Sequence, residues 1–369
     1  MTDTTPKRLY SLDALRGFDM FWIMGGDAIV VSIGKATNSS FFDSLAVQFE
    51  HPAWHGFALY DLIFPLFLFL AGVATPYSIG RELAKGTSRK KLLWRVVKRG
   101  MILVILGVIT NTQGFQILPL SEIRFGSVLG RIGLAYMFAN IIYLYAGTRA
   151  RMVWTAALLL GYWLLLKFTA APGFPAGDLT MEGNFASYID RIIMPGKLYL
   201  GVHDPEGFAS TVPAISTALI GIFAGELLKN GKMTETKKAI YLFVAGIVSL
   251  LLAQLWNLDF PINKNLWTSS FVLHAGGLSL ILLAIFYYII DILNHRKWAF
   301  FFVVIGMNSI LIYMSGVFIN WSYTTNAFFK WAVQLTGEQF GMVTFFVCMV
   351  IVKWWFLYFL YKKKVFLRV

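Results

Sequence analysis

Residues 49–72 read FEHPAWHGFALYDLIFPLFLFLAG, and this stretch decides the fold class. From residue 57 onward it is almost wholly apolar, and with the residues that follow it is long enough to cross a bilayer as a helix. Two histidines, His51 and His55, precede the apolar run, and one carboxylate, Asp61, lies inside it. The stretch therefore predicts a membrane-spanning helix with ionisable groups at its entrance.

The composition extends this prediction to the whole chain. Of the 369 residues, 57% are hydrophobic and only 14% are charged, whereas a soluble domain needs more charge to cover its surface. Apolar runs of about twenty residues recur along the sequence. We therefore expect an all-α polytopic membrane protein, formed as a single transmembrane domain over residues 1–369 with about ten transmembrane helices. The expected helices are 12–33, 57–80, 93–110, 126–146, 152–169, 209–229, 238–256, 266–291, 299–320 and 339–361.

The first apolar stretch is expected to stay in the mature protein. Asp13, Arg16 and Asp19 interrupt it, and no small-residue cleavage site follows, so it is not a cleavable signal peptide. The single cysteine, Cys348, has no partner for a disulfide within the chain and is expected to pack.

The basic residues predict the orientation of the helices. A formal net charge of +13 is also found in nucleic-acid-binding proteins, but here most lysines and arginines fall in alternate loops of the predicted topology. The positive-inside rule then places both termini in the cytoplasm and the loops 34–55 and 170–208 outside. His51 consequently faces outward from what we expect to be a bacterial cytoplasmic membrane. The long outer loop, rich in Gly, Pro and Asp, is typical of a functional segment and is a candidate lid.

Charged side chains in the first helix need a reason, because charge inside the hydrocarbon is costly. Asp13, Arg16 and Asp19 are spaced by three and share one helix face, where Arg16 can bridge both acids. The group either fixes helix packing, or Arg16 reaches an anionic ligand that enters from the cytoplasm. Both interpretations stay open.

Asp27 and His51 form the most promising pair. Asp27 follows two glycines at the outer end of the first helix, and His51 begins the second helix at a similar depth. An acid beside an imidazole orients the ring and raises its basicity. There is a simpler alternative for each residue. Asp27 ends the first helix in solvent, and His51 precedes the second helix without a catalytic role.

Other polar residues fall in or beside apolar runs. Asp61 either holds helices together or lines a cavity, and Arg131 either pairs with Asp61 or binds an anionic group. His55 and His274 are expected to pack or to form hydrogen bonds. The remaining candidates are Asn263, Lys264 and Asn265, which precede the eighth helix, and Asn308 in GMNSILIYM. The sequence contains no metal-binding motif, nucleophile elbow, Walker loop or dinucleotide fingerprint.

Several blocks carry a resemblance to a known family. They are RLYSLDALRGFDMFWI (8–23), HPAWHGFALYDLIFPLFLFLAG (51–72), GRIGLAYMF (130–138), YIDRIIMPGKLY (188–199), DPEG (204–207), PINKNLWTSSFVL (261–273) and GMNSILIYM (306–314). In this order they resemble the heparan-alpha-glucosaminide N-acetyltransferase family, from about residue 8 to the C-terminus.

The resemblance implies an activity and a catalytic residue. The family moves acetyl from cytosolic acetyl-CoA to the amine of a terminal glucosamine across the membrane, and its catalytic histidine lies in a block similar to HPAWHG, which transfers that role to His51. We expect a bacterial-type member of the family that lacks the luminal N-terminal domain and extra first helix of the lysosomal members. Asp27 stands where those members have an asparagine, and a carboxylate there strengthens His51 as a base or selects a cationic amine.

These residues suit amine acetylation. A glucosamine amine must lose a proton as it attacks a thioester, and an imidazole, with an ordinary pKa of about 6.5, can take it near neutral pH. We expect His51 to act as a general base in direct transfer, or as an acetyl-carrying nucleophile, with Asp27 orienting it. Arg131, Lys264 and Asn265 are candidates for polarising the thioester or holding coenzyme A phosphates. Asp61, Asn308 and Arg16 complete the expected binding residues, and no metal is expected.

The coenzyme and the partners follow from the same interpretation. Arg95, Lys98 and Arg99 lie at the basic start of a helix. They either bind the nucleotide end of acetyl-CoA or only determine the orientation of the helix in the membrane. The expected partners are acetyl-CoA, an amino-sugar or glycan acceptor, membrane lipid and a second copy in a homodimer, without nucleic acid. The competing hypotheses are a secondary transporter of a small sugar or anion and an acyltransferase for a different cell-envelope acceptor.

Overall fold

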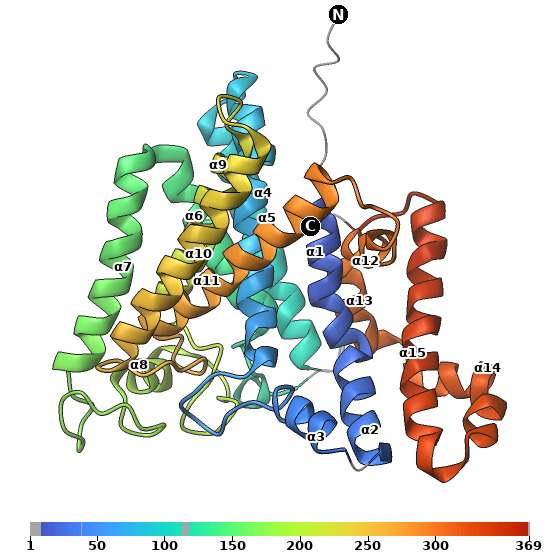
Figure 1. The fold of residues 1–369 in the computed structure, drawn as a ribbon. Helices are drawn as coiled ribbons and strands as arrows, with labels where there is room; N and C mark the ends of the chain where they lie inside the picture. Colours follow the sequence, from blue (N-terminus) through green and yellow to red (C-terminus); the bar gives the residue numbers. More distant parts are fainter. Residues whose placement is uncertain (1–8, 38, 113–117, 368–369) are drawn as a thin grey trace, which may run out of the picture. The chain divides into compact units, whose positions relative to one another are not determined.

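The computed structural model describes residues 9–37, 39–112 and 118–367, and these ranges are built from helices and loops (Figure 1). They contain no β-strand, and their one β-bridge joins Arg124 to Gly196. The all-α prediction is therefore confirmed. Three basic residues used to predict the orientation, Lys7, Arg8 and Arg368, lie outside the described residues.

Eight helical stretches in the described chain are long and apolar enough to cross a membrane. A ninth is obtained if α12 (Ala299–Gly306) and α13 (Ser309–Phe318), which are bent by 64°, form one span. The eight are Tyr10–Thr37 (α1, η1 and α2), Leu59–Ala84 (η2 and α4), Val128–Tyr145 (α6), Thr148–Phe168 (α7), Thr211–Lys229 (α9), Glu235–Asn257 (α10), Ser269–Ile292 (α11 and η4) and Gly337–Lys362 (α15). Each corresponds to a predicted helix.

The remaining predicted helix is α5 (Arg89–Asn111). Its first half carries Arg95, Lys98 and Arg99 in addition to the basic residues at its start. This charge keeps α5 out of the apolar set, so eight or nine spans are supported where about ten were predicted. The side of the membrane on which each loop lies stays a prediction.

Short helices form inside loops where the sequence predicted none. They are α3 (Ser40–Val47), η3 (Leu120–Glu122), α8 (Phe185–Ile193) and α14 (Trp321–Leu335). Of these, α14 packs directly against α15. The predicted outer loops are therefore partly helical.

The chain divides into two compact units, which are described separately. Unit 1 consists of residues 1–50, 234–243 and 281–368, and unit 2 consists of residues 51–233 and 244–280. The boundaries at 243/244 and 280/281 fall inside α10 and α11, respectively. The single domain expected from the sequence stays a prediction.

In unit 2, helix α4 (Ile63–Ala84) is held tightly against α9 by glycines. A Cβ atom added at Gly72 would lie 2.1 Å from the Ala218 carbonyl oxygen, and one at Gly221 would lie 2.1 Å from the Phe69 carbonyl oxygen. Only glycine permits this backbone approach, which is how helices pack closely in a bilayer. Because α4 is fixed in this way, the polar residues at its start have a defined position.

In unit 1, α1 (Tyr10–Phe21) packs against α12 through Gly17 and Gly306, where an added Cβ would collide with backbone atoms of the other helix. The next turn is π-helical (η1, Trp22–Gly26) and contains Gly25 at a φ of 132°, which only glycine adopts readily. The chain then continues as α2 (Asp27–Thr37).

The predicted bridge between the two acids of α1 is wrong. A guanidinium nitrogen of Arg16 lies 3.8 Å from Asp13, but the carboxylate of Asp19 has no hydrogen-bond partner in the described chain. Side chains on a helix lean toward its N-terminus, so Arg16 extends toward Asp13 and away from Asp19.

Candidate functional site

The site is built around the entrance of α4. The chain enters this helix through a 3-10 turn, η2 (Leu59–Leu62), in which Asp61 reaches back to accept a hydrogen bond from the Ala58 backbone N–H at 3.0 Å. A carboxylate is stabilised at the start of a helix because the first N–H groups there have no partner within the helix. The side chain of Asp61 is only 1% exposed. This turn therefore holds a buried acid at a fixed position.

His51 is bonded to that acid. Its Nδ1 atom lies 2.7 Å from Asp61 Oδ1, and its ring lies 5.2 Å from that of Tyr60. Because a carboxylate accepts hydrogen bonds, Nδ1 carries the proton in the neutral ring, and Nε2 keeps its lone pair. The His51 side chain is 51% exposed. The imidazole is thus anchored at one edge and open at the other.

Lys264 completes the cluster from a loop more than two hundred residues away in sequence. Its ammonium lies 3.1 Å from Asp61 Oδ1 and 3.3 Å from each ring nitrogen of His51. Burial lowers the pKa of Lys264, and the charge of Asp61 opposes this shift. His51, Asp61 and Lys264 are called the His51 cluster below.

The loop that carries Lys264 is tied down on both sides. Asn263 accepts a hydrogen bond from the Leu266 backbone N–H at 2.9 Å, and its own N–H donates to Thr268 Oγ1 at 3.1 Å. The Gly56 N–H donates to the Ile262 carbonyl at 2.9 Å. The loop before α11 and the loop before α4 therefore form one connected support. Asn265, a predicted binding residue, lies in this same loop.

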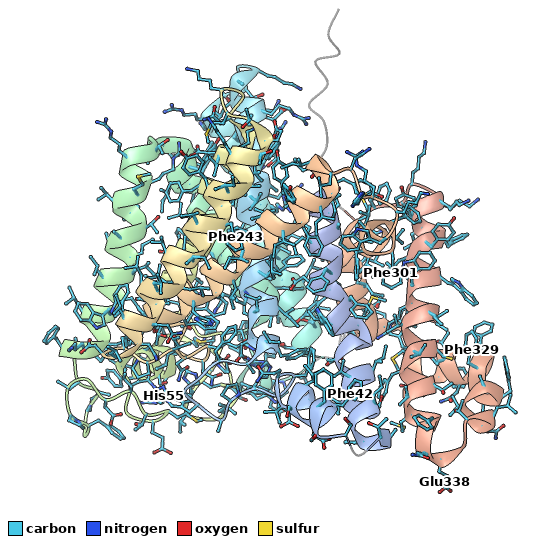
Figure 2. All side chains as sticks on the ribbon, viewed as in Figure 1. Phe42, His55, Phe243, Phe301, Phe329 and Glu338 are labelled. Carbon is cyan, nitrogen blue, oxygen red and sulfur yellow. The ribbon has the colours of Figure 1, made fainter. Side chains whose placement is uncertain are left out.

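His55 belongs to the support and not to the cluster. Its Nδ1 accepts a hydrogen bond from the Asn263 side-chain amide at 3.2 Å, and burial lowers its pKa. Figure 2 shows His55 among the loops at the end of unit 2 where α4 begins. It forms a hydrogen bond, as the sequence predicted.

Arg131 is buried beside the segments that carry the His51 cluster. It is 2% exposed, and its guanidinium lies over the ring of Trp267 at 4.8 Å and over the ring of Phe64 at 5.9 Å. Phe64 follows Asp61 by less than one turn of helix, and the Trp267 N–H donates to the Lys264 carbonyl at 3.0 Å. The two rings that Arg131 contacts therefore belong to the segments that carry Asp61 and Lys264.

The hydrogen bonds of Arg131 go to neutral groups. Its Nη2 donates to Ser210 Oγ and, at 3.4 Å, to the Gly207 carbonyl. Within the described chain, Arg131 and Asp61 form no ion pair, so this alternative from the sequence is not seen. Trp267 beneath it adopts a left-handed backbone conformation, with a φ of 52°, which is uncommon for a bulky residue.

A salt-bridge network that the sequence did not predict orders the outer loop. Arg124 donates to Asp204 from Nε at 2.8 Å and from Nη2 at 2.7 Å, and it also bonds to Glu206. Burial alone would raise the pKa of Asp204, but the bonds from Arg124 lower it below its ordinary value. The available signal was the length and composition of the loop 170–208, which contains HDPEG at 203–207.

A second group in this loop is buried and contains another histidine, His203. His203 Nδ1 lies 2.7 Å from Ser187 Oγ, and its ring packs edge-on against Trp54 at 5.1 Å. Burial lowers the pKa of His203 to about 4, so the ring is neutral. Trp54 also donates to the Leu179 carbonyl at 2.8 Å. The outer loop is thereby attached to the HPAWHG segment.

Three predicted site residues lie in unit 1. Asp27 begins α2 and accepts a hydrogen bond from the Ala28 N–H at 2.7 Å. Asn308 lies at the bend between α12 and α13, where its side chain bonds to the backbone of Val365 and Leu367. The third is Arg16, already placed beside Asp13. Because His51 belongs to unit 2, its pairing with Asp27 stays a prediction.

A pocket opens at the other end of α4 within unit 2. It has a volume of about 640 Å³ and is lined by Pro76, Tyr143, Thr148, Met152, Phe223, Glu226, Leu227, Lys229 and Asn230. Lys229 donates to the Pro76 carbonyl at 2.8 Å, and Arg151 pairs with Glu226 beside it. In Figure 1, α4 runs from the end that carries the His51 cluster to the end at which α9 terminates. We call this the Lys229 pocket.

No metal centre is formed by the part of the chain that the structure describes, which contains no group of three or more His, Cys, Asp or Glu side chains placed to hold an ion. The His51 cluster offers instead a base, an acid that orients it and a neighbouring cation. This set of groups can move a proton and stabilise developing negative charge.

Comparison with known proteins points to one family. The family model described as heparan-alpha-glucosaminide N-acetyltransferase, catalytic, matches residues 8–254. The mouse protein named heparan-alpha-glucosaminide N-acetyltransferase is 30% identical over 378 residues, which cover 87% of this chain and 56% of the mouse protein. The human protein of the same name is 28% identical over 422 residues, which cover 99% of this chain and 60% of the human protein. The chain thus spans a little more than half the length of these relatives.

Proposed function

The chain belongs to the heparan-alpha-glucosaminide N-acetyltransferase family, and on that premise we propose that it is a membrane-embedded acetyltransferase. It moves the acetyl group of acetyl-CoA to the amine of a glucosamine-type sugar. The observation that carries this proposal is the His51 cluster, in which a half-exposed imidazole is hydrogen-bonded to a buried carboxylate at 2.7 Å.

His51 acts as the general base. Its Nε2 lone pair takes a proton from the acceptor amine while the amine nitrogen attacks the thioester carbonyl carbon. The C–N bond forms and the C–S bond breaks, and the departing thiolate recovers the proton from the imidazolium. Asp61 stabilises the imidazolium through its bond to Nδ1, as an acid does for a catalytic histidine.

Lys264 supplies the positive charge. In the tetrahedral intermediate the thioester oxygen becomes negative, and the ammonium that is paired with Asp61 stabilises that oxygen. The same ammonium contacts His51 in the resting protein, so the substrate displaces it from Nε2. Arg131 and Asn265 extend the positive and polar lining toward the coenzyme.

The coenzyme approaches from the opposite end of unit 2. Pro76 in the Lys229 pocket follows Asp61 by fifteen residues, or roughly 22 Å of helix, a distance that the pantetheine arm and nucleotide can span together. Lys229 and the neighbouring Arg151 suit the phosphates. Arg95, Lys98 and Arg99 remain alternative partners for the nucleotide; Arg95 already pairs with Glu82 at 3.4 Å.

The His51 cluster faces the outside of a bacterial cytoplasmic membrane in this proposal, and the basic end with residues 81–92 faces the cytoplasm. Single cysteines introduced at Ser40 and Ser88 check the orientation. An impermeant thiol reagent applied to intact cells should label the first and spare the second, and equal labelling would contradict the orientation.

The activity is tested with purified protein in lipid nanodiscs and acetyl-CoA labelled in the acetyl group. We expect free coenzyme A and labelled N-acetylglucosamine in equal amounts from glucosamine, and the same assay with heparan ends and muropeptides identifies the preferred acceptor.

A transporter is the second candidate, because the bent pair α12 and α13 is typical of transporter helices. Unconsumed acetyl-CoA with every acceptor would reject the transferase.

A further inference from the structure

Asp19 is the buried acid that the proposed acetyl transfer does not use. It lies near the C-terminal end of α1, within the span Tyr10–Thr37, and it is 1% exposed. Neither carboxylate oxygen has a hydrogen-bond partner in the described residues. An acid inside a bilayer is retained against a substantial cost, which makes it a functional residue until shown otherwise.

The charged and titratable groups around α1 are engaged elsewhere. On α1 itself, Arg16 lies 3.8 Å from Asp13. The helical turn η4 (Tyr287–Ile292) contributes Asp291, which accepts from the Ser11 N–H at 3.1 Å and lies 3.8 Å from Arg296.

The other elements of unit 1 packed against α1 add no charge. Helix α12 and the π-helical turn η1 contain no titratable residue, and α13 contributes Tyr313 while η4 adds Tyr287 and Tyr288. On α15, which packs against η1, Lys353 donates to the Met24 carbonyl at 2.8 Å. No cation in the described part of unit 1 forms an ion pair with Asp19.

We infer that Asp19 is a proton-binding site inside the membrane-spanning part of unit 1. An ionised carboxylate that is buried without a hydrogen bond or a counter-ion is unstable relative to its neutral form, so Asp19 holds a proton at neutral pH. A neutral carboxyl in the bilayer is the type of group through which membrane proteins take up and release protons. The ligand is the proton, and this capability does not depend on acetyl transfer.

The inference is tested on the full-length protein in nanodiscs with a lipophilic carbodiimide. This reagent adds to a protonated carboxyl group in apolar surroundings and leaves a stable acylurea, which peptide mass spectrometry locates. We expect modification of Asp19 at neutral pH that declines as the pH is raised, while Asp13, the ion-paired acid of the same helix, is spared. Absence of modification at Asp19 at every pH would overturn the inference, as would protection by sodium ions at constant pH, which would indicate a metal-cation site.

Infrared spectroscopy gives a second measurement. The difference between the wild-type and Asp19→Asn spectra at neutral pH should contain the carbonyl band of a protonated carboxyl group, because asparagine replaces that group with a neutral side chain of the same shape. A difference spectrum that contains only carboxylate bands would show that Asp19 is ionised and would refute the proposal. If the variant does not fold, the carbodiimide result on the wild-type protein decides alone.

Discussion

Asp61 Oδ1 lies 2.7 Å from His51 Nδ1, and the same oxygen lies 3.1 Å from the ammonium of Lys264. One carboxylate oxygen therefore serves both the proposed base and the proposed electrostatic stabiliser. Because the Asp61 side chain is only 1% exposed, water does not compete for these bonds. The position of His51 therefore depends on Asp61.

Replacing Asp61 by asparagine should lower turnover by about 10²–10⁴-fold. The amide keeps the shape of the side chain but no longer stabilises an imidazolium, so kcat should fall more than KM rises. Asp27→Asn is the matched control, because it makes the same chemical change at the other candidate partner of His51. Steady-state kinetics of both variants checks this, and a larger loss in Asp27→Asn would transfer the orienting role to Asp27.

Lys264→Arg should extend activity to higher pH. Burial lowers the pKa of Lys264, so the ammonium loses its charge at a lower pH than an exposed lysine and activity declines on the alkaline side. Arginine stays protonated throughout this range, so the alkaline limit should move upward even if the maximum rate is reduced. The pH dependence of kcat measures this, and an unchanged alkaline limit would show that Lys264 does not supply the charge.

Arg124→Ala should destabilise the fold by about 3–5 kcal/mol, because it leaves buried Asp204 without its counter-ion. The lowered pKa of Asp204 means that its ion pair contributes stability above the ordinary carboxyl pKa and loses it as the pH falls through the lowered value. The difference in melting temperature between wild type and variant should therefore shrink in acid.

Lys167→Ala is the control for this prediction, because the pair of Lys167 with Asp259 is much more exposed. It should change the melting temperature far less. Equal losses in the two variants, or a difference that persists in acid, would contradict the role assigned to the Arg124 network.

Lys229→Ala should raise KM for acetyl-CoA without a matching change in KM for the sugar. The variant removes a cation from the pocket proposed for the nucleotide and leaves the His51 cluster intact. The triple neutralisation of Arg95, Lys98 and Arg99 is the comparison, because those residues were the sequence-based candidates. A larger effect in the triple variant would move the nucleotide to the start of α5.

The sequence predicted most helices correctly for a physical reason, whereas the catalytic role of His51 stays a prediction. Long apolar runs have few alternatives to helices in a bilayer, and the HPAWHG block carries a specific resemblance. The hydrogen-bond partner of His51 was harder to predict. Asp61 lies inside the apolar run, and from that depth alone we expected it to hold helices together or to line a cavity. It reaches His51 because η2 tightens the entrance of α4 and turns the carboxylate back toward the loop.

Contacts between loops that are distant in sequence could not be predicted from the sequence. Lys264 stands 213 positions from His51, and no periodicity indicates that their side chains meet. The bonds of Arg124 to the HDPEG segment cross 80 residues in the same way. The predicted bridge from Arg16 to Asp19 was wrong because it was based on spacing alone. Spacing does not give the direction in which helical side chains lean.

The most direct test of the proposed mechanism is the acetyl-transfer rate of His51→Ala against His55→Ala. The two histidines are four positions apart in one loop, but His51 bonds to Asp61 and His55 bonds to Asn263. His51→Ala should remain folded and lose about 10²–10⁴-fold in turnover, whereas His55→Ala should keep its turnover and lose only stability. A folded His51→Ala protein that transfers acetyl at the wild-type rate would contradict the assignment of His51 as the base.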